Sequence, residues 1–240
     1  MRQNKFGIAA WFCAAVVLSS AGSAAARPRA LVYKGPGACD ELCSESAAEI
    51  ARSAGFETHF VGPDSGSSSV FADASIWIQP GGVAATAAEA MSPKLKRNLR
   101  NFIARGGGYV GFCAGGFLAT AEVGTSGVRG LGILPGWTSL RDGDQSAAIL
   151  SINWDGNQRS IYWEGGPYFD FPNDSDVEVI ARYPDGEPAA VRSGFGRGRV
   201  FVTGLHPEAP RKWLDYYKLK DADGPDADLV REMMAWVTEP

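Results

Sequence analysis

The sequence has little histidine, little cysteine and no long hydrophobic run. Two histidines, His59 and His206, and four cysteines occur in 240 residues. The formal net charge is −4, so the chain lacks the positive excess that a nucleic-acid surface needs. The basic run at 94–100 contains apolar residues at helical spacing, which indicates the solvated face of a helix. We therefore expect no nucleic-acid partner, no metal and no cofactor.

The longest apolar run near the start of the chain, Phe6–Leu18, is too short and too rich in alanine for a membrane span of about 20 residues. It follows two basic residues and precedes the small residues Ala24–Ala26, which is the order of a secretory signal peptide. We interpret residues 1–26 as that signal and 27–240 as one domain, since no repeat or linker divides it. An uncleaved anchor is the alternative. The protein is expected to be exported, periplasmic or secreted, with no membrane contact after cleavage.

Removal of the signal leaves three cysteines, Cys39, Cys43 and Cys113. In an oxidising compartment Cys39 and Cys43 could form a disulfide across one helical turn, which would leave Cys113 unpaired. Two free thiols, or a redox or metal site, are the alternatives. A metal site would have to recruit His59 from the next strand.

Strand and helix signals alternate through the first half of the chain, which predicts an α/β fold with a parallel sheet between helices. The second half has strand signals joined by turns, which predicts an antiparallel extension. The expected strands are 30–33, 58–61, 75–79, 108–112, 147–154, 160–164, 177–183 and 198–204. Helices are expected over about 40–54, from Pro93 to Arg105 after a Ser92 cap, and at the carboxyl terminus.

Cys113 has the sequence context of a nucleophile. It lies in Gly111–Gly116, directly after an apolar strand, where glycines permit a sharp strand-to-helix turn. His206 and Glu208 follow a later strand, so the imidazole could hold the thiol as a thiolate while the carboxylate orients the ring. For this geometry we expect an extended segment from His206 to Glu208. The alternative is that Cys113 is a small core residue.

Two further glycine-rich segments are expected near the carboxyl ends of strands, where α/β proteins bind ligands. Tyr33 and Gly35 belong to the first, Gly166 and Tyr168 to the second. We consider these four residues as substrate-binding candidates. An ordinary turn with core aromatic side chains explains either segment equally well.

Six short motifs occur in a familiar order. They are Tyr33–Ala38, Ile78–Gly82, Gly111–Gly115, Leu131–Gly136, Gly165–Phe169 and Gly196–Glu208. With them the chain resembles the class I glutamine amidotransferase-like superfamily, and within it the group similar to the N-terminal domain of biotin–protein ligase. The resemblance implies a flavodoxin-like sheet, a Cys113–His206–Glu208 triad, and an oxyanion site formed by Ala114 with Gly81 or Gly82.

The expected function is an exported Cys-His-Glu hydrolase of an amide or γ-glutamyl-like carbon–nitrogen bond, acting through a thioester on an unknown small-molecule or peptide-like substrate. A non-catalytic module that binds a small molecule or a cell-wall fragment is the alternative. A third hypothesis is a redox protein that uses Cys113 with Cys39 or Cys43. The sequence does not predict the oligomeric state.

Overall fold

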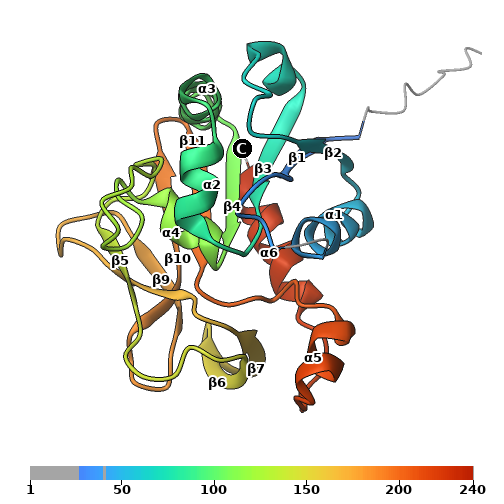
Figure 1. Ribbon diagram of the computed structural model, residues 1–240, viewed down its shortest axis with the longest axis vertical. Helices are drawn as coiled ribbons and strands as arrows, with labels where there is room; N and C mark the ends of the chain where they lie inside the picture. The colour runs from blue at the N-terminus through green and yellow to red at the C-terminus, as the bar shows by residue number, and fades with distance from the viewer. Residues whose placement is uncertain (1–26, 40–41, 240) are drawn as a thin grey trace, which may run out of the picture.

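The structure, a computed structural model, describes residues 27–39 and 42–239; the predicted signal at 1–26 lies outside them. Figure 1 shows a central sheet with helices on both sides. Its strands are β1 (Arg29–Tyr33), β2 (Glu57–Val61), β3 (Ala74–Gln79), β4 (Gly108–Phe112), β5 (Trp137–Leu140), β6 (Ala148–Trp154), β7 (Asn157–Trp163), β8 (Pro167–Asp170), β9 (Glu178–Arg182), β10 (Pro188–Phe195) and β11 (Gly198–Thr203). Its helices are α1 (Cys43–Ser53), the 3-10 turn η1 (Ser68–Phe71), α2 (Ala84–Ala90), α3 (Pro93–Ala104), α4 (Ala114–Ala119), α5 (Arg211–Tyr217) and α6 (Ala227–Thr238).

The main sheet has nine strands in the order β2-β1-β3-β4-β11-β10-β9-β6-β7. The pairs from β2 to β11 are parallel, and those from β11 to β7 are antiparallel. Strands β5 and β8 form a separate antiparallel pair. The predicted α/β fold, with a parallel region and an antiparallel extension, is confirmed.

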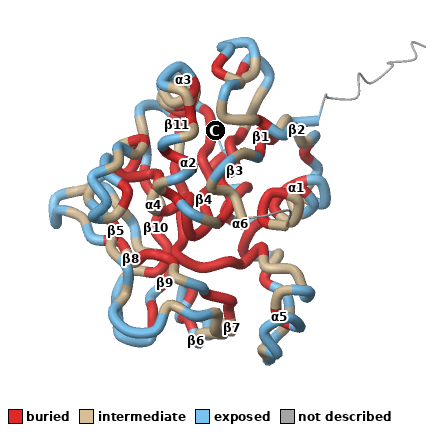
Figure 2. Tube along the Cα trace, viewed as in Figure 1, coloured by how far each residue is buried: buried red, intermediate tan, exposed pale blue. Residues whose placement is uncertain are grey.

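Alternating side chains of the parallel strands enter two apolar layers, one on each face of the sheet. Ile76 and Ile78 of β3 lie in the layer covered by α1 and α6, whereas Trp77 lies in the layer covered by α2, α3 and α4. Strand β4 is buried at every position. Figure 2 shows these buried strands at the centre, with exposed residues in the loops and outer helix faces. Within the described residues no helix is long and apolar enough to cross a membrane.

Helix α3 begins as the sequence predicts. The Ser92 hydroxyl accepts a hydrogen bond from the Leu95 N–H at 3.2 Å, and Pro93 occupies the first turn. Leu95, Leu99 and Ile103 are buried, while basic residues of the same helix remain partly or fully exposed. The basic run is therefore a solvated helix face, as expected.

Several elements escape sequence reasoning. Strand β10 carries the polar residues Arg192 and Ser193, yet it pairs with both β9 and β11 because tertiary pairing overrides its weak strand pattern. Helices α2, α4 and α5 are too short to show a helical period. Helix α1 begins at Cys43, later than expected, and residues 40–41 lie outside the described residues. In α6, Met234 is fully buried and Trp236 only partly so.

Gly115 lets α4 pack closely on the sheet, and its replacement tests this packing. A Cβ atom at Gly115 would lie 2.5 Å from the Gln79 carbonyl oxygen of β3. We expect Gly115→Ala to lower the free energy of unfolding by about 1–3 kcal/mol, because backbone must shift to relieve the overlap. Denaturant unfolding measures it. Gly194→Ala is the control, since among the described residues no atom outside its chain neighbours lies within 4 Å of the added Cβ. Equal stability of the two variants would contradict the packing argument.

Candidate active site

Cys113 occupies a sharp turn between β4 and α4. Its backbone has φ 45° and ψ −100°, a region that residues other than glycine rarely adopt and that costs on the order of 1–3 kcal/mol. The Cys113 N–H donates to the Thr203 carbonyl at 2.8 Å, and the Cys113 carbonyl accepts from the Gly116 N–H at 2.9 Å. The conformation is thereby held from both sides. Such outliers cluster at functional sites, and this one has the geometry of a nucleophile elbow.

His206 and Glu208 follow β11, the parallel neighbour of β4. The His206 Nδ1 lies 2.9 Å from the Glu208 Oε1, and the His206 backbone N–H donates to the Tyr162 carbonyl at 2.9 Å. The expectation of an extended segment is wrong. The chain turns here, and the Ala209 N–H donates to the His206 carbonyl at 3.0 Å. A turn brings the two side chains together as well as an extended segment would, because it folds the carboxylate back to the ring.

The three side chains form one buried polar group. Cys113, His206 and Glu208 are 4%, 5% and 2% exposed. Burial by itself lowers the pKa of His206, but the Glu208 carboxylate and Cys113, which also shares a hydrogen bond with the ring, raise that pKa well above its usual value. The carboxylate therefore favours the protonated form of the imidazole.

Aromatic side chains and a glycine fix the imidazole ring. Tyr162 and Trp213 contact it edge-on, with ring centroids at 5.7 and 5.4 Å. On another side the backbone of Gly81 lies so close that a Cβ atom there would be 2.3 Å from the His206 Cε1. The ring therefore has little freedom to rotate away from Cys113 and Glu208.

The Gly81–Gly82 turn and the start of α4 are the expected oxyanion donors. Gly82 has φ 135°, and it is braced by bonds from the Cys39 N–H to the Gly81 carbonyl and from the Val83 N–H to the Gly37 carbonyl. Across the described part of the chain, the backbone N–H groups of Gly82 and Ala114 have no backbone acceptor. Gly82 lines the cavity at Cys113, whereas Gly81 packs under His206. This arrangement favours Gly82 over Gly81 as the second donor.

Cys39 and Cys43 form a disulfide with a Cα–Cα distance of 5.5 Å, and Cys113 is free and buried. The predicted pairing is confirmed. The bridge lies beside the triad, since the Cys43 sulfur, a His206 nitrogen and a Glu208 oxygen lie within 4.8 Å of one another. These are metal-ligand atom types, but the disulfide occupies the sulfur. In the oxidised protein this group lacks the thiolate that a metal would need.

A cavity of about 450 Å³ opens above Cys113. Sequence reasoning missed most of its wall, which comes from β7, the chain just after it, and α5. The lining residues are Cys39, Leu42, Cys43, Gly82, Val83, Cys113, Tyr162, Glu164, His206, Lys212, Trp213, Tyr216 and Tyr217. The aromatic pair Tyr216 and Tyr217 was the available signal, since exposed aromatic residues often mark binding surfaces.

The structure places the four substrate-binding candidates away from this cavity. Tyr33 is fully buried, and its hydroxyl donates to the Pro36 carbonyl at 2.9 Å. Gly35 packs on Tyr33, and Gly166 packs on the Gly204 carbonyl. Tyr168 packs partly buried against the core. For Tyr33, Gly35 and Gly166, close packing occupies the space that a substrate would need.

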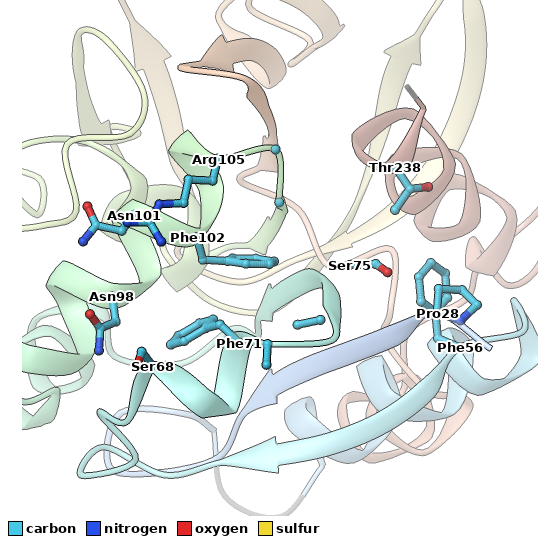
Figure 3. Close-up of a pocket in the computed structure, with 14 residues that line it drawn as sticks. Pro28, Phe56, Ser68, Phe71, Ser75, Asn98, Asn101, Phe102, Arg105 and Thr238 are labelled. Atoms are coloured by element: carbon cyan, nitrogen blue, oxygen red, sulfur yellow. The ribbon is translucent and has the colours of Figure 1, made fainter. Parts of the chain in front are cut away.

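A second cavity, of about 1070 Å³, lies at the opposite, amino-terminal edge of the sheet (Figure 3). Phe71 of η1 and Phe102 of α3 lie side by side in it, with ring centroids 5.3 Å apart. Asn98 and Asn101 of α3, and Arg105 just after it, add polar groups. None of the triad residues lines this cavity.

The fold and the turn at Cys113 together indicate the class of fold to which the protein belongs. The structure is similar to that of PurLQS from Thermotoga maritima, with a TM-score of 0.63, 21% identity, and coverage of 89% of this chain and 100% of the other. A crystal structure of a glutamine amidotransferase gives a TM-score of 0.63, 20% identity, and coverage of 86% and 98%. This is a class I glutamine amidotransferase-like, flavodoxin-like fold.

Sequence comparison gives the family. The family described as "Biotin-protein ligase, N terminal" matches residues 29–129 and 143–236, so the chain belongs to it. The biotin–protein ligase of Schizosaccharomyces pombe is 31% identical over an alignment of 163 residues that covers 57% of this chain and 26% of the ligase. An uncharacterized protein of Chlamydia muridarum is 30% identical over 131 residues, 45% of this chain and 50% of that protein. The chain thus spans half or less of these relatives.

The raised pKa of His206 predicts a pH-dependent stability. A raised folded-state pKa contributes stability that is complete below the unfolded pKa of about 6.5 and is lost as pH rises through the folded value. Glu208→Gln removes the strongest cause of the increase in pKa. The gap in free energy of unfolding between wild type and variant should therefore be largest below the unfolded pKa and should shrink as pH rises through the folded-state pKa of wild type. Denaturant unfolding over a series of pH values measures the gap, and a smaller gap at low pH than at high pH would contradict the action of Glu208 on His206.

Proposed function

We propose that the protein is an exported, Cys-dependent hydrolase of an amide or γ-glutamyl-like carbon–nitrogen bond. The observation that carries the proposal is the strained Cys113 elbow beside the buried His206–Glu208 pair, at the base of an open cavity. Fold and family support the general class, a Cys-dependent amidohydrolase type. The ligase activity of the yeast relative is not carried over, because this chain spans 26% of that protein.

The first half-reaction forms a thioester. The Cys113 thiolate attacks the carbonyl carbon, and the carbonyl oxygen becomes an oxyanion near the N–H groups of Ala114 and Gly82. Two such donors together lower the barrier by several kcal/mol, on the order of 3 each. Protonated His206 then gives its proton to the leaving nitrogen, the carbon–nitrogen bond breaks, and the amine departs. Glu208 accepts the Nδ1–H bond and keeps the imidazole oriented.

The second half-reaction releases the acid. A water molecule takes the place of the amine, His206 removes its proton, and the oxygen attacks the thioester carbonyl. The same N–H groups hold the second oxyanion, and Cys113 leaves as thiolate. Water is the acceptor in this proposal because amide transfer by synthetases needs ATP, for which an exported protein has no obvious supply.

A binding module is the second candidate, and two observations favour it. The Cys113 Sγ lies 3.7 Å from the Glu164 carbonyl oxygen, so backbone already contacts the sulfur. The cavity wall is also rich in aromatic side chains, which bind ligands without any chemistry. In that case the elbow serves to shape the pocket.

Replacement of Cys113 separates the two candidates. Wild type incubated with a panel of amides and periplasmic-type peptides should acquire an acyl group on Cys113, seen by mass spectrometry, and should release amine. Cys113→Ala and Cys113→Ser should fold normally and do neither, because no thiolate is present. Glu208→Gln should slow both steps about 10- to 10⁴-fold, as orienting carboxylates do in other triads. Unchanged turnover in Cys113→Ala would overturn the mechanism, and tight binding without any acylation would favour the module.

Export rests on the signal-like residues 1–26 and is supported by the disulfide, since such bridges persist in oxidising compartments. In a bacterial host the protein should accumulate outside the cytoplasm, with Arg27 at its amino terminus. Cell fractionation and amino-terminal sequencing measure this. A mature protein that keeps residues 1–26 and remains in the membrane fraction would support the uncleaved anchor.

A further inference from the structure

Glu164 is an acidic side chain in the cavity whose charge the proposed mechanism does not use. It follows β7 directly, is exposed, and lines the same cavity as Cys113. Its backbone carbonyl lies 3.7 Å from the Cys113 Sγ, so the residue is a neighbour of the reacting atom. A carboxylate in this place creates a negative field where substrate must bind.

Two tyrosines hold this carboxylate in position. The Tyr162 hydroxyl donates to the Glu164 Oε2 at 2.8 Å, and the Tyr217 hydroxyl donates to the Oε1 at 3.2 Å. Burial and Glu164 itself raise the pKa of Tyr162, so this phenol remains a neutral donor. Both hydroxyl groups therefore fix the carboxylate without cancelling its charge.

No cation within the described residues neutralises Glu164. Some exposed acids of the chain form ion pairs, such as Glu178 with Arg192 at 2.7 Å, but among the described residues no ion pair includes Glu164. Lys212 lines the cavity and does not form an ion pair with it. The rings of Tyr162, Trp213 and Tyr217 line the same cavity as the carboxylate, and the Tyr162 ring contacts the other two, with centroids 5.4 and 6.4 Å apart. Aromatic faces beside an unpaired carboxylate are the common environment of a bound ammonium group.

We propose that Glu164, with the aromatic rings beside it, binds a cationic group of the substrate. The substrate class is then an amide or peptide that carries an ammonium or guanidinium group close to the scissile carbonyl. The inference rests on the proposed function, because it takes Cys113 as the reacting atom. Glu164 acts in it as a specificity residue and performs no step of the hydrolysis.

Thiol reagents of different charge test the proposal without a known substrate. The probes are 2-(trimethylammonio)ethyl methanethiosulfonate and its uncharged carbon isostere, the 3,3-dimethylbutyl ester. In each, the Cys113 thiolate attacks the sulfenyl sulfur, a new S–S bond forms, and methanesulfinate leaves. The measurement is the ratio of the two second-order rate constants, cationic over neutral, followed on the Cys113 peptide by mass spectrometry.

Glu164→Gln should lower this ratio about tenfold, since it removes the charge and keeps an acceptor for the tyrosines. Asp73→Asn is the matched control. It removes one exposed charge at the amino end of β3, the edge opposite Cys113, and should leave the ratio unchanged. An equal ratio in wild type and Glu164→Gln would overturn the proposal. An equal fall of the ratio in Glu164→Gln and Asp73→Asn would also overturn it, because that result would indicate only a long-range effect of charge.

A measurement on wild type alone covers the case in which the variant does not fold. Choline should slow the reaction of Cys113 with the neutral reagent, and its carbon isostere 3,3-dimethylbutan-1-ol should slow it much less. Equal protection by the two would overturn the cation site. A failure of the proposed function is recognised by a different measurement. If His206 does not activate the thiol, His206→Ala will leave the rate constant of Cys113 with the neutral reagent unchanged.

Discussion

The pairing of β4 with β11 is the constraint on which the candidate site depends. Phe112 lies opposite Thr203 in this parallel pair, and the next residue, Cys113, donates its N–H to the Thr203 carbonyl. Parallel pairing in this register brings the carboxyl ends of both strands to one edge. Cys113 and His206 therefore meet although the chain between them forms six other strands. A slip of one residue would turn the side chains of either strand to the opposite face and separate the two groups.

Burial makes the triad effective and also costly. An imidazolium and a carboxylate are both expensive to remove from water, and each is tolerated because the other is present. The Glu208 Oε2 is buried with no hydrogen-bond partner among the described side chains and backbone groups, so its compensation is incomplete. A protein selected for stability alone would not retain a buried carboxylate oxygen that lacks a hydrogen-bond partner. The strained backbone of Cys113 indicates the same compromise, because the surrounding strand and helix must hold it in place.

Two segments outside the sheet add walls to the cavity above the triad. The disulfide-linked residues Cys39 and Cys43 line one side, and the Cys39 N–H braces the Gly81–Gly82 turn. Helix α5 forms the other wall, and in Figure 1 it lies at one end of the molecule next to the β6–β7 hairpin. The hydroxyl of Tyr217 links α5 to Glu164. The sheet thus fixes the reacting groups, while these added walls decide what reaches them.

The sequence by itself determined the α/β architecture and the capped start of α3, and it predicted the elbow and the Cys39–Cys43 pair with alternatives left open. Each of these follows from a local pattern: an apolar run, a Ser-Pro cap, glycines around one cysteine, or two cysteines four residues apart. Only the tertiary structure decided the role of the glycine-rich turns, since Tyr33 and Gly166 are excluded from the cavity by packing against distant residues. It also decided the turn at His206, the strand β10 and the cavity wall of Tyr162, Glu164 and α5. The physical reason is that these features depend on contacts between segments far apart in the chain, and no local pattern records such contacts.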